Sequence, residues 1–155
     1  MLNKPEIAIK HFSSTLEETP DDVLTLAFLA LSYISVDNYE EAKNSCDKAI
    51  NVAPDMPWGY ISHALLSFIL RDFYSVLDYG TTAKKLGAET SILFYILALS
   101  HRKVGSNSQA QELITCYYDK IQYEKAADPR MHFRNFIEKR HLKYLRINIT
   151  KKASR

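Results

Sequence analysis

The stretch VLTLAFLALSYISVDNYEEAKNSCDKAINVAPD, which runs from Val23 to Asp55, decides the fold of this chain. It contains two segments whose apolar residues have helical spacing, joined by a short polar turn. A shift of 34 residues in either direction reaches residues of the same kind. The matching columns are Leu26, Tyr60 and Phe94; Ala30, Ala64 and Ala98; Ala8, Ala42, Val76 and Ala110; Phe12, Cys46, Gly80 and Ile114; and Pro20 with Pro54. A fixed period of this length predicts a helical solenoid, in which stacked helix pairs cover each other's apolar faces.

The residues inside each period resemble the tetratricopeptide repeat (TPR), which alternates bulky and small residues along two helices and ends on proline. The first complete unit matches this pattern at Leu26, Leu29, Ala30, Tyr33, Ala42, Ala49 and Pro54. The next two units match at Tyr60, Ala64, Ala83, Phe94, Leu97, Ala98 and Ala110, and depart from it at His63, Ser67, Val76, Gly80, Ala88 and His101. The resemblance covers roughly residues 3–122 and implies an all-α fold, a right-handed α-α superhelix. It implies function only by class, because TPR arrays mostly bind other proteins.

We therefore expect about three and a half repeats followed by a C-terminal helix. The predicted boundaries are a solenoid over residues 1–128, with a half repeat at 3–20 and repeats at 23–56, 57–90 and 91–122, and a basic capping helix and tail at 129–155. The half repeat lacks its first helix. Either a single helix caps the solenoid there, or the sequence is an excerpt from a longer protein, which is the interpretation we favour.

Local signals refine the expected helix ends. Asp37 and Glu40 are predicted to cap the second helix of the first complete unit. Gly87 is predicted to end a later helix in a left-handed conformation. Gly80 stands inside a helix where the family has a bulky residue, which predicts either a close helix contact or a kink.

Charge is distributed unevenly along the chain. Residues 129–155 hold nine Lys or Arg and one acidic residue, whereas residues 1–128 have a net charge of −6. The sequence therefore predicts an acidic solenoid with a basic end. The longest uncharged apolar run is too short to span a membrane, and the N-terminus lacks the apolar core of a secretion signal. We expect a cytoplasmic protein with two reduced thiols, Cys46 and Cys116.

The first helix of each unit is apolar almost all round, although a surface helix normally carries one apolar stripe. One side packs within the unit, and the TPR resemblance implies that the other side lines a concave groove. The predicted groove residues are Leu24, Ala27, Phe28, Leu31, Trp58, Ile61, Ser62, Leu65, Phe68, Ile92, Tyr95, Leu99 and Arg102. The family's groove for a C-terminal carboxylate needs Lys, Asn and Arg at such positions, and none stands here before Arg102, which disfavours that function.

An open groove of this apolarity would exceed what monomers usually expose, so something should cover it. A partner's amphipathic helix or extended apolar peptide, the chain's own last helix, or a second copy of the chain could do so. The opposing interpretation is a tight superhelix in which these side chains simply meet each other.

The predicted last helix is amphipathic and basic. The simpler interpretation is a solenoid cap with its charges in water. The alternative is a nucleic-acid-associated protein, in which a basic patch contacts polyanions. Its residues would be Arg134, Lys139, Arg140, Lys143 and Arg146.

Catalysis is not predicted, because no motif for a metal site, a phosphate loop or a nucleophile elbow occurs. His63 and His101 replace repeat core residues, so we interpret them as packed or groove-edge histidines rather than ligands. We expect no cofactor and no metal. The sequence favours a non-enzymatic interaction scaffold with a protein or peptide partner and no membrane span. It leaves open a homo-oligomer, or a role in a larger regulator or an assembly or secretion-chaperone factor.

Overall fold

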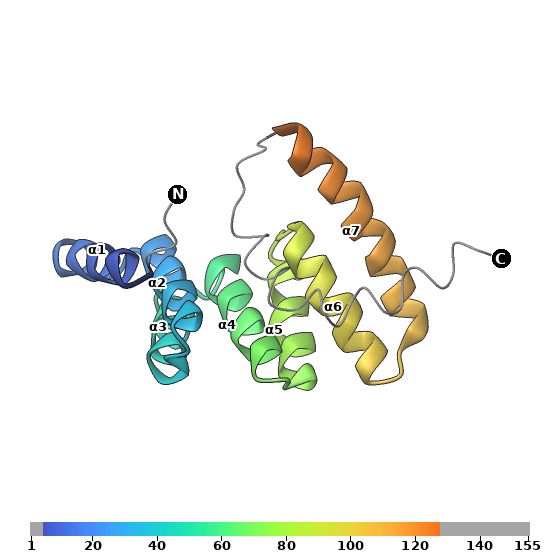
Figure 1. Ribbon diagram of the computed structural model, residues 1–155, viewed down its shortest axis with the longest axis horizontal. Coiled ribbons are helices and arrows are strands. Elements are labelled where there is room, and N and C mark those ends of the chain that lie inside the picture. Colours follow the sequence, from blue (N-terminus) through green and yellow to red (C-terminus); the bar gives the residue numbers. More distant parts are fainter. Residues whose placement is uncertain (1–4, 128–155) are drawn as a thin grey trace. The chain divides into compact units, whose positions relative to one another are not determined.

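The computed structural model describes residues 5–127, with side chains as far as Gln122. In this part of the chain seven α-helices follow one another and no strand occurs (Figure 1). They are α1 (Pro5–Glu18), α2 (Val23–Ser35), α3 (Tyr39–Val52), α4 (Pro57–Ile69), α5 (Phe73–Lys85), α6 (Ser91–Lys103) and α7 (Asn107–Ala127). The predicted all-α repeat fold is confirmed. Helix α7 continues past Gln122, where the third predicted repeat ends, and the predicted C-terminal helix lies outside the described residues.

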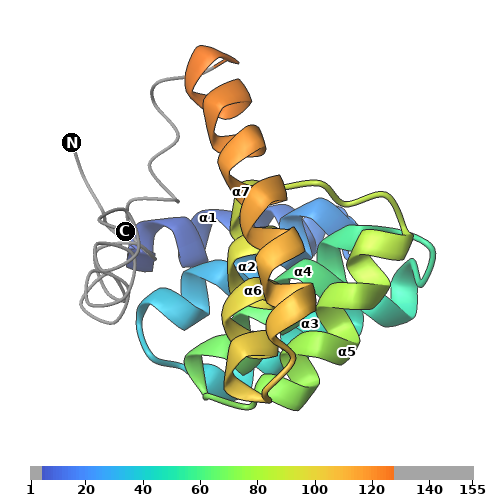
Figure 2. The ribbon, with the colours of Figure 1, turned by 90° about the vertical axis from the view of Figure 1, so that its right-hand side faces the viewer.

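Contacts between residues divide the chain after Lys120, and the described residues up to that point form one compact unit. Within the first unit each helix from α1 to α5 packs against the next helix in the chain. The first helices of successive repeats also touch, α2 with α4 and α4 with α6. Helices α2, α4 and α6 therefore form one layer, as a helical solenoid requires. Figure 2 views this unit from the end at which α6 and α7 lie.

The turn between the two helices of a repeat uses a left-handed residue at the same place each time. Asp37, Arg71 and Gly105 stand one period apart and have φ values of 60°, 64° and 88°. The prediction that Asp37 caps α3 is wrong, because Asn38 accepts the hydrogen bond from the Glu41 backbone N–H at 3.4 Å. Since Asp37 takes the left-handed position that closes the turn, the next residue becomes the cap.

Small residues mark the close approaches between helices. Ala30 and Ala64 are fully buried and Ala98 is 2% exposed. At Gly80 an added Cβ would lie 2.7 Å from Leu97 Cδ2, so this glycine permits close contact between α5 and α6. Gly87, with a φ of 88°, follows the C-cap of α5 as predicted.

Candidate protein-interaction face

The structure separates the thirteen predicted groove residues by their exposure. Four are exposed and three partly exposed: Leu24, Phe28, Trp58 and Arg102, and then Leu31, Ile92 and Leu99. Six are buried: Ala27, Ile61, Ser62, Leu65, Phe68 and Tyr95. The buried six contribute packing rather than accessible surface. The surface that a partner could reach is therefore narrower than the predicted groove and lies mainly on α2 and the start of α4.

Three large exposed side chains make up what we call the apolar face: Leu24, Phe28 and Trp58. They are 41%, 44% and 42% exposed. Leu24 and Trp58 stand at matching positions of α2 and α4, two helices that pack together, and Phe28 follows Leu24 by one helical turn. Phe12 of α1 stacks on Phe28, with ring centroids 5.9 Å apart and planes inclined by 18°. The face thus draws on two successive repeats.

The chain fixes the start of α2 with a side-chain cap. The Asp22 carboxylate accepts hydrogen bonds from the backbone N–H groups of Leu24 and Thr25, at 3.1 and 3.4 Å. The Thr25 hydroxyl donates a further bond of 2.7 Å, which is the main reason that the pKa of Asp22 lies below its ordinary value. At α4 the start is set instead by Pro57 in the first turn. Both devices hold the helix end on which Leu24 or Trp58 stands.

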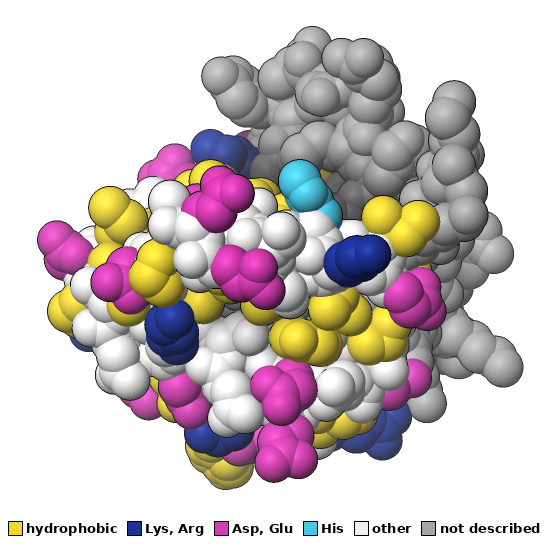
Figure 3. All heavy atoms as spheres, turned by 90° about the vertical axis from the view of Figure 1, so that its left-hand side faces the viewer, with side chains coloured by type: hydrophobic (Ala, Val, Ile, Leu, Met, Phe, Trp, Pro, Cys, Tyr) yellow, Lys and Arg dark blue, Asp and Glu magenta, His cyan; other side chains and the backbone are white. Residues whose placement is uncertain are grey.

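The part of the chain that carries the apolar face is acidic. Residues 5–60 carry ten Asp or Glu and three Lys or Arg, a net charge of −7, whereas residues 61–120 have a net charge of +1. Figure 3 shows hydrophobic and acidic side chains, with some basic ones among them, at the end of the solenoid where α1 lies. The apolar face therefore belongs to the acidic part of the described chain.

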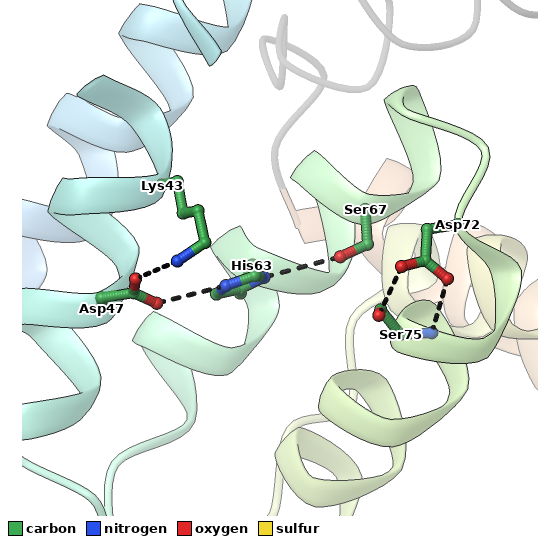
Figure 4. Close-up of polar contacts among 6 residues, drawn as sticks. All are labelled: Lys43, Asp47, His63, Ser67, Asp72 and Ser75. Carbon is green, nitrogen blue, oxygen red and sulfur yellow. Dashed lines mark hydrogen bonds and ion pairs between the residues drawn. The ribbon is translucent and has the colours of Figure 1, made fainter. Parts of the chain in front are cut away.

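A polar cluster lies between α3 and α4 (Figure 4). The Asp47 carboxylate lies 2.6 Å from Lys43 Nζ and 3.2 Å from His63 Nε2, and His63 Nδ1 lies 3.5 Å from Ser67 Oγ. The His63 ring stacks on Tyr79 of α5, with centroids 3.8 Å apart. Burial lowers the pKa of His63, and this outweighs the opposing effect of Asp47.

The order carboxylate, imidazole, hydroxyl is the one used by serine nucleophiles, but its setting here is structural. Ser67 is 4% exposed and His63 is 6% exposed, so a substrate cannot reach the hydroxyl while the helices stay packed. The interpretation of His63 as a packed histidine is confirmed. The neighbouring pair in Figure 4 is a helix cap, in which Asp72 accepts bonds of 3.1 and 2.6 Å from the backbone N–H and hydroxyl of Ser75.

One further hollow lies among α5, α6 and α7, with a volume of about 160 Å³. Its lining residues are Thr81, Lys84, Leu97, His101, Gln109, Glu112 and Leu113. This volume is below the roughly 300–1,000 Å³ of most ligand sites. Burial lowers the pKa of His101, whose Nδ1 atom has no hydrogen-bond partner among the described residues.

The described residues contain neither a cluster of metal-ligating side chains nor a helix that could span a membrane. No three His, Cys, Asp or Glu side chains in this part of the chain gather as metal ligands would. None of the described helices combines the length and apolarity needed to cross a bilayer. The basic residues of the nucleic-acid alternative lie outside the described residues, so that alternative stays a prediction: Arg134, Lys139, Arg140, Lys143 and Arg146.

Paired antiparallel helices with a 34-residue period, small residues at their contacts and a layer of first helices define the tetratricopeptide-repeat fold. The resemblance inferred from the sequence is confirmed by solved structures. The TPR protein YrrB, described as having an unusual peptide-binding site, superimposes with a TM-score of 0.67 at 20% identity, over 84% of this chain and 66% of that one. MamA superimposes with a TM-score of 0.61 at 18% identity, over 88% of each chain.

Comparison of sequences adds one distant relative. The chain is 21% identical over 121 residues to the protein SGT1 homolog of Bos taurus, an alignment that spans 77% of this chain and 36% of that protein. The chain thus covers about a third of that relative. No model of a known protein family matches the chain. At these identities the likeness establishes the fold alone.

Proposed function

We propose that this protein is a non-enzymatic interaction module whose apolar face binds an apolar segment of a partner protein. The observation that supports it best is the exposure of Leu24, Phe28 and Trp58 on helices whose other sides are packed. Large apolar side chains grouped on one surface mark interaction sites in soluble proteins. An amphipathic helix or an extended peptide is the shape that such a surface on adjacent helices accommodates.

The fold supports the same proposal. YrrB, which shares the fold, is described as a peptide-binding TPR protein. The grouping of residues that imitates a nucleophile relay is buried at Ser67 and His63. We place the module within a larger regulator or an assembly or secretion-chaperone factor, where it would hold a partner rather than transform it.

Trp58 is the single tryptophan of the chain and part of the apolar face, so its fluorescence reports directly on the site. The test titrates the full chain with a synthetic amphipathic helical peptide that carries Leu and Phe on one side. We expect a saturable change in Trp58 emission. Phe28→Gln should weaken binding about tenfold, since it removes apolar contact worth roughly 1–2 kcal/mol.

The matched control is Tyr74→Gln. Tyr74 is an aromatic residue of α5 that is 77% exposed and stands outside the apolar face. This variant should bind the peptide as the parent does. An equal loss of peptide affinity in the two variants would contradict the proposal. So would a parent protein whose Trp58 emission does not change when the peptide is added. Circular dichroism establishes that both variants keep their helicity.

A further inference from the structure

The apolar face has acidic residues at a fixed place beside it. Asp21 precedes Leu24 by three residues, and Asp55 precedes Trp58 by three residues. Both carboxylates are exposed, and they stand one repeat period apart. Because α2 and α4 are neighbours, the two acids stand just before the adjacent helix starts that carry Leu24 and Trp58.

The third repeat shows what distinguishes these two acids. Glu89 stands at the matching position, three residues before Ile92, and its carboxylate lies 3.5 Å from Lys120 Nζ. Within the described residues Asp21 and Asp55 have no such cation beside them. Among the described residues, a lysine thus partners the acid at the third site and no cation partners the acids at the first two sites.

The sequence around Asp21 contains no basic residue over a long stretch. Residues 11–42 contain seven Asp or Glu and no Lys or Arg. Glu17 and Glu18 at the end of α1 add two exposed carboxylates to the same end of the solenoid. A surface with this potential attracts cations and repels acidic segments before any contact forms.

We infer that the segment bound by the apolar face is basic, with apolar side chains flanked by lysine or arginine. This inference rests on the proposed function and names the chemistry of its partner. The apolar side chains lie on Leu24, Phe28 and Trp58, and the flanking cations lie beside Asp21 and Asp55. The exposed rings of Phe28 and Trp58 also accept an arginine guanidinium on their faces.

Two synthetic peptides with the same apolar residues test the inference, one flanked by lysines and the other by glutamates. Binding to the full chain is followed by Trp58 emission at low and high salt. We expect the lysine peptide to bind at least about tenfold more tightly at 50 mM salt, because several charges act together. The difference should shrink at 500 mM salt, where the screening length falls to about 4 Å.

Charge variants locate the effect. The double variant Asp21→Asn with Asp55→Asn should weaken the lysine peptide about two- to tenfold, as expected for two exposed ion pairs, and leave the glutamate peptide no weaker. The control double variant, Glu40→Gln with Glu41→Gln, makes the same charge change at two exposed positions of α3. It should change the affinity less than about twofold, because its charges lie away from the face.

The outcomes separate the two proposals. Equal binding of both peptides, lost in Phe28→Gln, overturns the basic-partner inference and leaves the interaction function standing. Binding of neither peptide overturns both. A dimer of the chain that Phe28→Gln dissociates and the lysine peptide does not displace overturns the inference in favour of a second copy as occupant.

Discussion

Helices α2 and α6 occupy the same place in the first and third complete repeats, but their matching side chains meet different surroundings. Phe28 of α2 is 44% exposed, whereas Ile96, two periods later, is fully buried. Ser62, at the position between them, is 1% exposed. The same helical register thus yields a surface at one end of the repeat array and a core in the rest. A repeat pattern fixes which direction a side chain points, and the neighbours decide whether that direction is covered.

Placing glutamine at each of these two positions in turn should give the largest difference in stability. Ile96→Gln should lower the free energy of unfolding by about 3–5 kcal/mol, because it buries an amide without a partner and removes apolar contacts. Phe28→Gln should cost only about 1 kcal/mol, chiefly through the lost stacking on Phe12. Urea denaturation followed by circular dichroism measures both values. Equal costs would mean that Phe28 belongs to the core as much as Ile96 does.

A second comparison uses leucines one period apart. Leu65 is 2% exposed, while Leu31 and Leu99 are partly exposed at the matching positions. Leu65→Ala should cost about 2–5 kcal/mol, and Leu31→Ala or Leu99→Ala about 1 kcal/mol, because less buried surface is lost there. Chemical denaturation of the three variants orders them. A cost at Leu65 no larger than at Leu31 would show that Leu65 faces solvent.

The turns offer a third, smaller effect. Gly105 adopts a φ of 88°, and its counterparts Asp37 and Arg71 adopt the same left-handed conformation with side chains. Gly105→Ala should lower stability by about 1–2 kcal/mol, because a Cβ disfavours this conformation. Gly105→Asn should cost less, since asparagine tolerates it better. Thermal unfolding compares the two variants, and equal losses would show that backbone strain is not the cause.

The sequence predicted the helices and their pairing because these depend on local spacing. Alanine and leucine columns repeat every 34 residues, and the structure places Ala30, Ala64 and Ala98 at buried contacts. It could not predict exposure within the proposed groove. Leu31, Leu65 and Leu99 are identical residues in identical register, yet only Leu65 is fully covered.

Two further features of the molecule, a helix cap and an ion pair, could not be predicted from the sequence. The N-cap of α3 is Asn38 and not the predicted Asp37, because Asp37 has the left-handed backbone conformation of the turn. The pairing of Glu89 with Lys120 joins residues 31 apart in the chain, and no local sequence pattern predicts it. The charges were visible in the sequence, but which of the described acids pair with a described lysine was not.

The smallest expected effect on stability concerns a buried position at which the second complete repeat has a histidine and its neighbours have leucine. Leu29, His63 and Leu97 stand one period apart and are 7%, 6% and 2% exposed. Because burial holds the pKa of His63 below its ordinary value of 6.5, the unfolded chain takes up a proton first as the pH falls. The stabilising contribution of neutral His63 is therefore present above pH 6.5 and is lost as the pH falls through its lower folded value.

We expect the unfolding free energy to decrease as the pH falls from 7.5 to 5.5, and to decrease less in His63→Leu, which restores the residue type of the neighbouring repeats. Burial also lowers the pKa of His101. The His63→Leu variant should therefore retain part of the dependence of the unfolding free energy on pH. His11→Gln, a change at an exposed residue of α1, is the control and should keep the full slope. Urea denaturation at each pH gives these values. A protein that becomes more stable on acidification would contradict this prediction. It would show that the attraction between Asp47 and the imidazolium exceeds the cost of burying that charge.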